Sequence, residues 1–364
     1  MKTVHNVIFN NSSDMSVVCN ESVDLVVTSP PYPMIEMWDK IFSDQNPAIS
    51  EELKAGNGNR VFELMNQELD KVWREVYRVL KTGGFACINV GDATRKIGDE
   101  FKLYSSHSRI LEYCIKLGFS SLPGILWRKQ TNVPNKFMGS GMLPAGAYVT
   151  LEHEHILILR KGNKCCFKSE EEKLWRKKSA FFWEERNLWF SDTWEDLKGA
   201  RQKNIDKQIR ERSGAYPFEL AYRLINMFSL RQGTVLDPFL GTGTTMLAAM
   251  VAGRNSVGFE IDSDFAKQLS ARFNEVVEFS NYLIENRIKN HLDFVKERSI
   301  THGVLSHINK VYGFPVMTSQ EVEIEFSELN KIVEKNNEFE IEYKETPTMK
   351  FDETIIFKKK TKNR

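Results

Sequence analysis

Two short motifs contain the residues best suited to chemistry, and each follows an apolar segment rich in β-branched residues. The first motif comes after the run 23–27 and consists of Ser29, Pro30, Pro31 and Tyr32. The second comes after the run 234–236 and contains Asp237, Pro238, Phe239, Gly241, Gly243, Thr244 and Thr245. Open α/β sheets bind their ligands at polar turns that leave buried strands. We therefore expect both motifs to line one site.

The second motif is typical of a turn that holds a nucleotide-like cofactor. Gly241 and Gly243 can adopt positive φ and let the backbone approach a ligand, and the helix that follows offers free N–H groups. Asp237 could accept a hydrogen bond from a ligand ammonium, and Glu260 is placed to hold ribose hydroxyls. Met246 stands where a dinucleotide fingerprint has its third glycine, which favours S-adenosylmethionine over NAD. A tight turn without a ligand is the structural alternative.

The first motif is suited to gripping an exocyclic amine on a flat ring. The two prolines stiffen the turn and have no N–H, so that the Pro30 carbonyl and the Ser29 hydroxyl can both accept hydrogen bonds from one amino group. Tyr32 offers an aromatic face on which an extruded base could stack. A rigid loop with a packed tyrosine is the alternative. Together the motifs predict transfer of a group from a bound cofactor to an amine.

At these residues the chain resembles the amino-methylating DNA methyltransferases of restriction–modification systems. The catalytic motif precedes the cofactor motif, which is the order of their β group, and residues 80–84 and 88–92 resemble their intermediate motifs. Tyr216 matches the start of the helix beside the cofactor. With serine at position 29 the motif resembles that of the cytosine-N4 enzymes, whereas the adenine-N6 enzymes usually have aspartate there. The longer segment Ser29–Trp38 is similar to modification enzymes of the BamHI kind. Adenine-N6 methylation and a non-catalytic nucleic-acid-binding relative stay open as alternatives.

The resemblance implies a Rossmann-like class I methyltransferase fold, with a mostly parallel seven-stranded sheet, helices on both faces and an inserted target-recognition region. It implies S-adenosyl-L-methionine as the cofactor and double-stranded DNA as the substrate. The target cytosine would be flipped into the pocket and methylated directly at N4. A cognate restriction endonuclease would act independently on the same site.

The elements that must position these motifs alternate along the chain, which predicts an α/β protein with a mostly parallel sheet. The expected strands are 23–27, 85–90, 125–127, 156–159, 234–236 and 256–262, and the expected helices are 60–80, 106–117, 218–229, 245–252 and one from 265 onward. We divide the chain into a catalytic half (1–162), a target-recognition insertion (163–213), a cofactor-binding half (214–290) and a C-terminal appendage without assigned role (291–364).

Charge gives a local rather than a global signal for DNA. The net charge is +1, but residues 160–212 contain 15 Lys and Arg against 10 Asp and Glu. The residues predicted to contact DNA are Lys129, Lys136, Arg176, Lys177 and Lys178. A solvated charged face is an equal alternative for this strip, and the tryptophans of the same region are expected in a core or a small subdomain.

Composition places the protein among cytoplasmic globular proteins. No apolar run approaches the roughly 20 residues that span a bilayer, and the N-terminus has no secretory pattern. Five scattered cysteines argue against a disulfide framework. His153 and His155 alternate on a predicted strand, but their spacing fits no zinc pattern, so we expect no metal.

Overall fold

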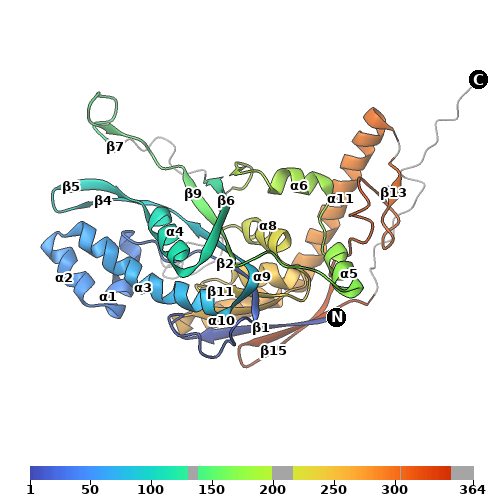
Figure 1. The fold of residues 1–364 in the computed structure, drawn as a ribbon, viewed down its shortest axis with the longest axis horizontal. Helices are drawn as coiled ribbons and strands as arrows, with labels where there is room; N and C mark the ends of the chain where they lie inside the picture. Colours follow the sequence, from blue (N-terminus) through green and yellow to red (C-terminus); the bar gives the residue numbers. More distant parts are fainter. Residues whose placement is uncertain (130–137, 199–215, 304, 346–364) are drawn as a thin grey trace, which may run out of the picture.

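The computed structural model describes residues 1–129, 138–198, 216–303 and 305–345, and its centre is a ten-stranded sheet (Figure 1). The strand order is β10-β6-β9-β3-β2-β11-β12-β1-β16-β15. These strands are β1 (Lys2–Phe9), β2 (Val23–Thr28), β3 (Leu80–Val90), β6 (Phe119–Arg128), β9 (His153–Lys161), β10 (Thr193–Trp194), β11 (Thr234–Asp237), β12 (Asn255–Glu260), β15 (Leu329–Lys335) and β16 (Glu338–Tyr343).

The middle of the sheet has the expected class I arrangement. Strands β3, β2, β11, β12 and β1 are parallel, and β9 runs antiparallel between β3 and β6. With β6 these make the seven expected strands, so the predicted fold class is confirmed. The sheet is wider than predicted because β10 extends one edge and the β15–β16 hairpin extends the other through β1. Strand β1 is an element that the sequence interpretation missed.

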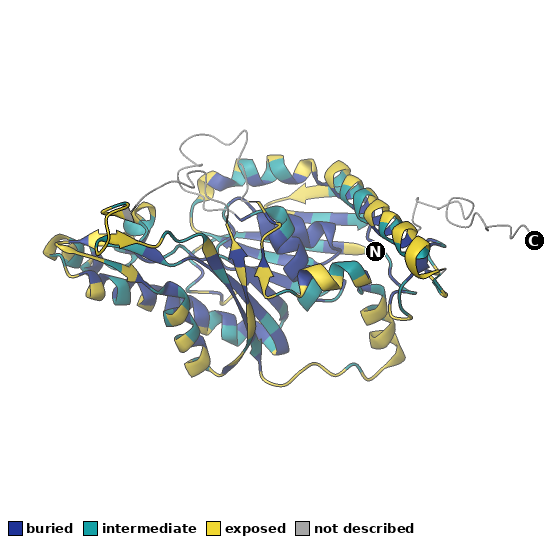
Figure 2. Cartoon of the chain, turned by 90° about the horizontal axis from the view of Figure 1, so that it is seen from above, coloured by how far each residue is buried: buried dark blue, intermediate teal, exposed yellow. Residues whose placement is uncertain are grey.

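Helices cover both faces of the sheet, as the alternating pattern predicted. Along β2, Val26 packs into a core with α3 (Gly58–Val79) and α4 (Ser106–Leu117), whereas Leu25 and Val27 pack into a core with α8 (Phe218–Phe228) and α9 (Thr244–Val251). A strand buried on both faces needs apolar residues at consecutive positions, which explains the apolar residues 25–27 in β2. Buried residues gather along the central strands, and the outer helix faces are exposed (Figure 2).

The remaining described elements surround this core. They are η1 (Glu36–Trp38), α1 (Asp39–Gln45), α2 (Ala48–Ala55), β4 (Ala93–Ile97), β5 (Glu100–Tyr104), β7 (Met138–Gly139), β8 (Ala147–Tyr148), α5 (Glu170–Lys178), α6 (Trp183–Trp189), η2 (Ser263–Phe265), α10 (Ala266–Asn274), α11 (Val276–His302), β13 (His307–Ile308) and β14 (Pro315–Val316). The β4–β5 and β7–β8 hairpins both project from one end of the molecule (Figure 1).

A third apolar core joins two regions that the sequence interpretation kept apart. Phe182 from the expected insertion packs with Ile288 of α11 and Phe314 of the C-terminal region. Arg287 of α11 also forms an ion pair with Glu185 of α6. The proposed boundary at residue 290 falls inside α11, so the end of the cofactor-binding half and the start of the appendage share one helix.

Two further observations concern covalent links and membranes. All five cysteines are free. Among the described residues, no helix has both the length and the apolar character that crossing a membrane requires.

Candidate active site

The two motifs meet at one cavity of about 440 Å³. The cavity lies where β2, β11 and β12 end, because parallel neighbours bring their carboxyl ends to the same edge of a sheet. Its lining includes Ser29, Pro30, Pro31, Tyr32, Tyr216, Asp237, Pro238, Phe239, Gly241, Thr244 and Glu260. The expectation that distant loops share one rim therefore agrees with the geometry. Gly243 and Thr245 lie behind the wall and shape it.

Asp237 connects the two halves of the site. Its carboxylate accepts hydrogen bonds from the Thr28 hydroxyl at 2.6 Å, from the Thr245 hydroxyl at 2.7 Å and from the Phe239 N–H at 3.1 Å. Thr28 immediately precedes the catalytic motif, so this buried carboxylate fixes the end of β2 against the end of β11. Burial raises the pKa of Asp237, whereas these donors act in the opposite direction. The side chain is thus a structural link as well as a wall of the cavity.

The glycine turn depends on the absence of side chains. Gly241 and Gly243 have φ of 51° and 77°, a region that favours glycine. A Cβ atom on Gly243 would lie 2.6 Å from the Leu269 side chain and 2.7 Å from that of Phe273, so these buried side chains would have to shift to admit it. The turn presents its backbone to the cavity, and α9 begins directly after it. This cradle fits a ligand that binds through close backbone contact.

Glu260 holds the same turn from the next strand. One carboxylate oxygen accepts from the Gly241 N–H at 2.8 Å and the other from the Asp262 N–H at 2.9 Å. Burial raises its pKa. Each carboxylate oxygen has two lone pairs, so these bonds leave acceptor capacity toward the cavity. Glu260 can therefore shape the turn and still hold hydroxyl groups of a ligand.

Arg272 is a site residue that sequence reasoning missed. Its guanidinium donates to the Thr242 carbonyl at 2.6 Å and to the hydroxyls of Thr242 and Thr244 at 3.1 Å each. Burial lowers the pKa of Arg272. The residue lies on α10, a helix that follows Glu260, and nothing in its local pattern marks it. Only packing of α10 behind the turn brings the cation there.

Tyr32 is fixed by a polar network that includes a second missed residue, Glu154. The phenol donates to the Glu154 carboxylate at 3.0 Å, and the Asn89 amide donates to the phenol oxygen at 3.0 Å. The Ser29 hydroxyl lies 2.9 Å from the phenol oxygen. Burial raises the pKa of Tyr32 well above its usual value, and the Glu154 charge adds to this effect. Lys129 pairs with Glu154 at 2.8 Å. The signal in the sequence was present, since Glu154 lies between the two histidines of β9.

Tyr216 supports the cofactor side of the cavity. Its hydroxyl is hydrogen-bonded to that of Thr245, which in turn donates to Asp237. Burial and the neighbouring carboxylate raise the pKa of Tyr216 well above its usual value, so the phenol stays neutral. The resemblance predicts Tyr216 beside the cofactor, and the structure places Tyr216 in the lining of the cavity.

The structure separates the residues predicted to contact DNA. Lys129 lines the cavity, and Lys136 lies outside the described residues. Arg176, Lys177 and Lys178 end α5, where Lys178 pairs with Glu325 at 2.9 Å. Ser179, which follows α5, accepts a hydrogen bond from the N–H of Arg231, and Arg231 lies just before β11. This helix therefore packs near the amino end of β11, and it lies across the molecule from the projecting hairpins (Figure 1). The geometry does not bring these three side chains to the cavity.

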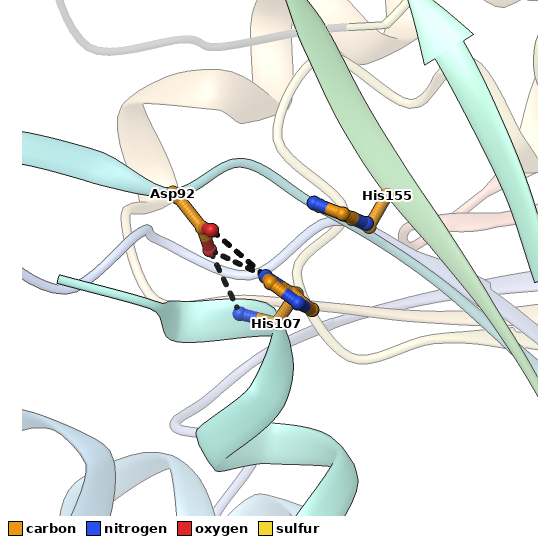
Figure 3. A group of neighbouring side chains, drawn as sticks. All are labelled: Asp92, His107 and His155. Carbon is orange, nitrogen blue, oxygen red and sulfur yellow. Dashed lines mark hydrogen bonds and ion pairs between the residues drawn. The ribbon is translucent and has the colours of Figure 1, made fainter. Parts of the chain in front are cut away.

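Asp92, His107 and His155 form a compact cluster beside the cavity (Figure 3). The His107 ring nitrogen lies 2.8 Å from the Asp92 carboxylate, and the two imidazole rings stack with centroids 3.7 Å apart. Burial lowers the pKa of His155 to about 4, so the ring is neutral near pH 7. Parallel rings direct their lone pairs along separate planes, which does not suit a shared metal ion. This arrangement fits a hydrogen-bonded support for Asp92, and the absence of a metal remains a prediction.

Comparisons with known proteins agree with this geometry. The family model described as DNA methylase matches residues 23–271. The chain is 52% identical over 348 residues to the type II methyltransferase M.MthZI of Methanothermobacter thermautotrophicus, covering 95% of this chain and 96% of the relative. It is 50% identical over 271 residues to the type II methyltransferase M.MjaI of Methanocaldococcus jannaschii, covering 71% of this chain and 88% of the relative.

A solved structure shows the same fold with its cofactor. It is a protein from Thermus thermophilus, described as a putative DNA modification methylase and complexed with S-adenosyl-L-methionine, with a TM-score of 0.58 and 32% identity. The match covers 75% of this chain and 96% of that one. S-adenosylmethionine is accordingly the cofactor. The chain belongs to the DNA methylase family and is a DNA methyltransferase of the restriction–modification kind.

Proposed function

We propose that the protein transfers a methyl group from S-adenosylmethionine to the exocyclic N4 amine of a cytosine flipped out of double-stranded DNA. The observation that carries this proposal is that the Ser-Pro-Pro-Tyr turn and the glycine turn open into one cavity. Specific sequence recognition, a cognate endonuclease at the same site and a cytoplasmic location complete the proposal. They rest on the likeness to type II methyltransferases.

The cofactor supplies an electrophilic methyl group, and the chain has to bind and orient it. The backbone of the glycine turn and the carboxylate of Glu260 form the part of the cavity suited to a nucleoside. Asp237 and Tyr216 line the same side. Because Thr28 and Asp237 are hydrogen-bonded, any shift of the cofactor turn would also shift the catalytic turn. Orientation of this kind is a large part of the rate of a direct transfer.

The polar network supports an acceptor role for the Ser29 hydroxyl. The Tyr32 phenol donates its proton to Glu154, so the hydroxyl of Ser29 donates to the phenol oxygen and directs its lone pairs elsewhere. Lone pairs of Ser29 and the Pro30 carbonyl can then accept both hydrogens of an amino group. Holding the amine in this way draws its lone pair out of conjugation with the ring and makes the nitrogen a better nucleophile.

Adenine-N6 methylation is the competing function. Both reactions use an exocyclic amine and the same cofactor, and the family model covers both kinds of enzyme. Serine at position 29 favours cytosine in our proposal because the related adenine enzymes usually carry aspartate there. An aspartate would bring a negative charge to the amine, whereas Ser29 leaves a neutral acceptor.

Mass analysis of nucleosides tests the proposal. DNA from cells that express the chain is digested, and N4-methylcytosine and N6-methyladenine are quantified together. We expect N4-methylcytosine that disappears in the Ser29→Ala variant. N6-methyladenine without N4-methylcytosine would replace cytosine by adenine as the substrate base. In a second assay with S-adenosylmethionine labelled in its methyl group, no transfer of label to any DNA would exclude the catalytic function.

A further inference from the structure

A short hairpin, followed in the chain by the cavity-lining residue Leu151, has an apolar and exposed tip. Strands β7 and β8 form this hairpin, which projects from the body of the molecule (Figure 1). Met142 is 88% exposed, Leu143 is 70% exposed, and Val149 just after the hairpin is 86% exposed. Large apolar side chains clustered in one exposed segment generally indicate an interaction surface.

The tip is an ordered turn. The Ser140 N–H donates to the Gly146 carbonyl at 2.8 Å, and the Ser140 hydroxyl donates to the Leu143 carbonyl at 2.7 Å. At the base of the hairpin, the Tyr148 ring packs on Phe101 of β5 with centroids 5.0 Å apart. The turn is thus held from inside and from the neighbouring hairpin. These contacts fix the turn in a conformation that leaves the side chains of Met142 and Leu143 exposed.

The hairpin grows out of the rim of the cavity. Lys129 comes before it in the chain and Leu151 comes after it, and both line the cavity that contains the catalytic turn. The segment 138–151 contains no charged residue, so the backbone phosphates of DNA would not be repelled. A duplex that delivers a base to this cavity would therefore meet the hairpin at its surface.

We propose that the tip residues Met142, Leu143 and Pro144 enter the DNA duplex as an apolar wedge beside the target base. Proteins that unstack DNA insert side chains of these types between base steps. Filling the gap stabilises the duplex once the target has turned into the cavity, and this offsets part of the lost stacking. The proposal rests on the proposed function, because it assigns to the hairpin the step that supplies the flipped base.

Methylation of two matched duplexes tests the wedge. The site is first read from modified-base sequencing of DNA from expressing cells. One duplex has the target base paired, and the other has the same base opposite an abasic position, where it is already free to turn out. The double variant Met142→Ser with Leu143→Ser is compared with the wild type on both. Ile300→Ser is the control, because Ile300 is 80% exposed at the far end of α11.

We expect the double variant to lose about tenfold or more in transfer to the paired duplex and to approach wild-type rates on the abasic one. The control should match the wild type on both. Equal loss on both duplexes, or no loss on either, would overturn the wedge. A change in oligomeric state, measured by light scattering, would instead assign the tip to a contact between copies of the chain and overturn it as well.

The test separates this proposal from the proposed function. If the wild type methylates adenine, the abasic position is placed opposite that adenine, and the comparison stays valid. If the wild type transfers no methyl group to either duplex, the proposed function has failed, and duplex binding with a fluorescent base analogue at the target then decides the wedge. If the fluorescence of the base analogue does not change when the wild type binds the duplex, the wedge is excluded.

Discussion

The hydrogen bond between Thr28 and Asp237 should be a measurable part of the stability of the fold. Thr28→Val removes the hydroxyl donor and keeps the shape and the β-branched backbone preference of the strand. Thr28 is fully buried and Asp237 is 3% exposed, so the bond is shielded from bulk water. The 2.6 Å distance indicates a well-formed bond to a carboxylate.

The magnitude follows from the burial of both groups. A hydrogen bond to a charged group contributes about 1.5–3 kcal/mol, and an unsatisfied buried acceptor costs a similar amount. Asp237 keeps donors from Thr245 and from the Phe239 backbone, so the carboxylate is not left bare. We therefore expect the free energy of unfolding to fall by about 2 kcal/mol. Methyl transfer should fall too, because Ser29 follows Thr28 directly.

Urea denaturation followed by circular dichroism measures the free energy of unfolding. Thr82→Val is the matched control, because the Thr82 hydroxyl also donates to a carboxylate, that of Glu21, but at an exposed position. We expect the control to change stability by less than about 0.5 kcal/mol. Equal effects of the two variants, or a Thr28 effect below about 0.5 kcal/mol, would refute the argument that burial gives this bond its strength.

Three further predictions concern the two turns and a buried histidine. Gly243→Asp should abolish cofactor binding measured by calorimetry, because Leu269 occupies the space of the new Cβ and φ is 77°. Tyr32→Ala should lower methyl transfer at least about a hundredfold through lost positioning, while cofactor affinity survives; parallel loss of both would contradict this division. Burial lowers the pKa of His5 to about 3, so the stability that its neutral form contributes is complete above pH 6.5 and is lost as pH falls. Relative to His5→Gln, the wild type should lose stability steadily as pH falls from 6.5 toward 3, because the unfolded state binds a proton that the buried ring does not; the same pH dependence of unfolding in both proteins across that range would refute it.

Periodicity in the sequence was sufficient for most of the elements around the site. The predicted helix 106–117 coincides with α4, and the predicted strand 234–236 lies within β11. Both have apolar patterns bounded by clear signals, such as Gly118 in the left-handed region after α4. Strand β1 was missed because it alternates buried and half-exposed residues over a short polar stretch. Its pairing with β12 and β16 defines it as a strand.

Partners that come from distant segments could not be predicted. Arg272 has no local signature, and the His-Glu-His pattern around Glu154 does not say which residue Glu154 will meet; their roles arise from contacts with Thr242 and Tyr32. The charge of α5 suggested DNA contact, but packing places Lys178 against Glu325 at the other end of β11. Charge counts along a segment carry no information about the face on which that segment will lie.

The sequence by itself determined the chemistry, since a stiff serine–proline turn and a glycine turn each need particular residue types at fixed spacing. Their order along the chain and the strands before them also determined the class of fold. Only the tertiary structure decided that Thr28 would bond Asp237, that a polar network would orient Ser29, and that the segment after an uncharged hairpin would reach the cavity at Leu151. These contacts join residues far apart in the chain, and their energies depend on burial that no local pattern encodes.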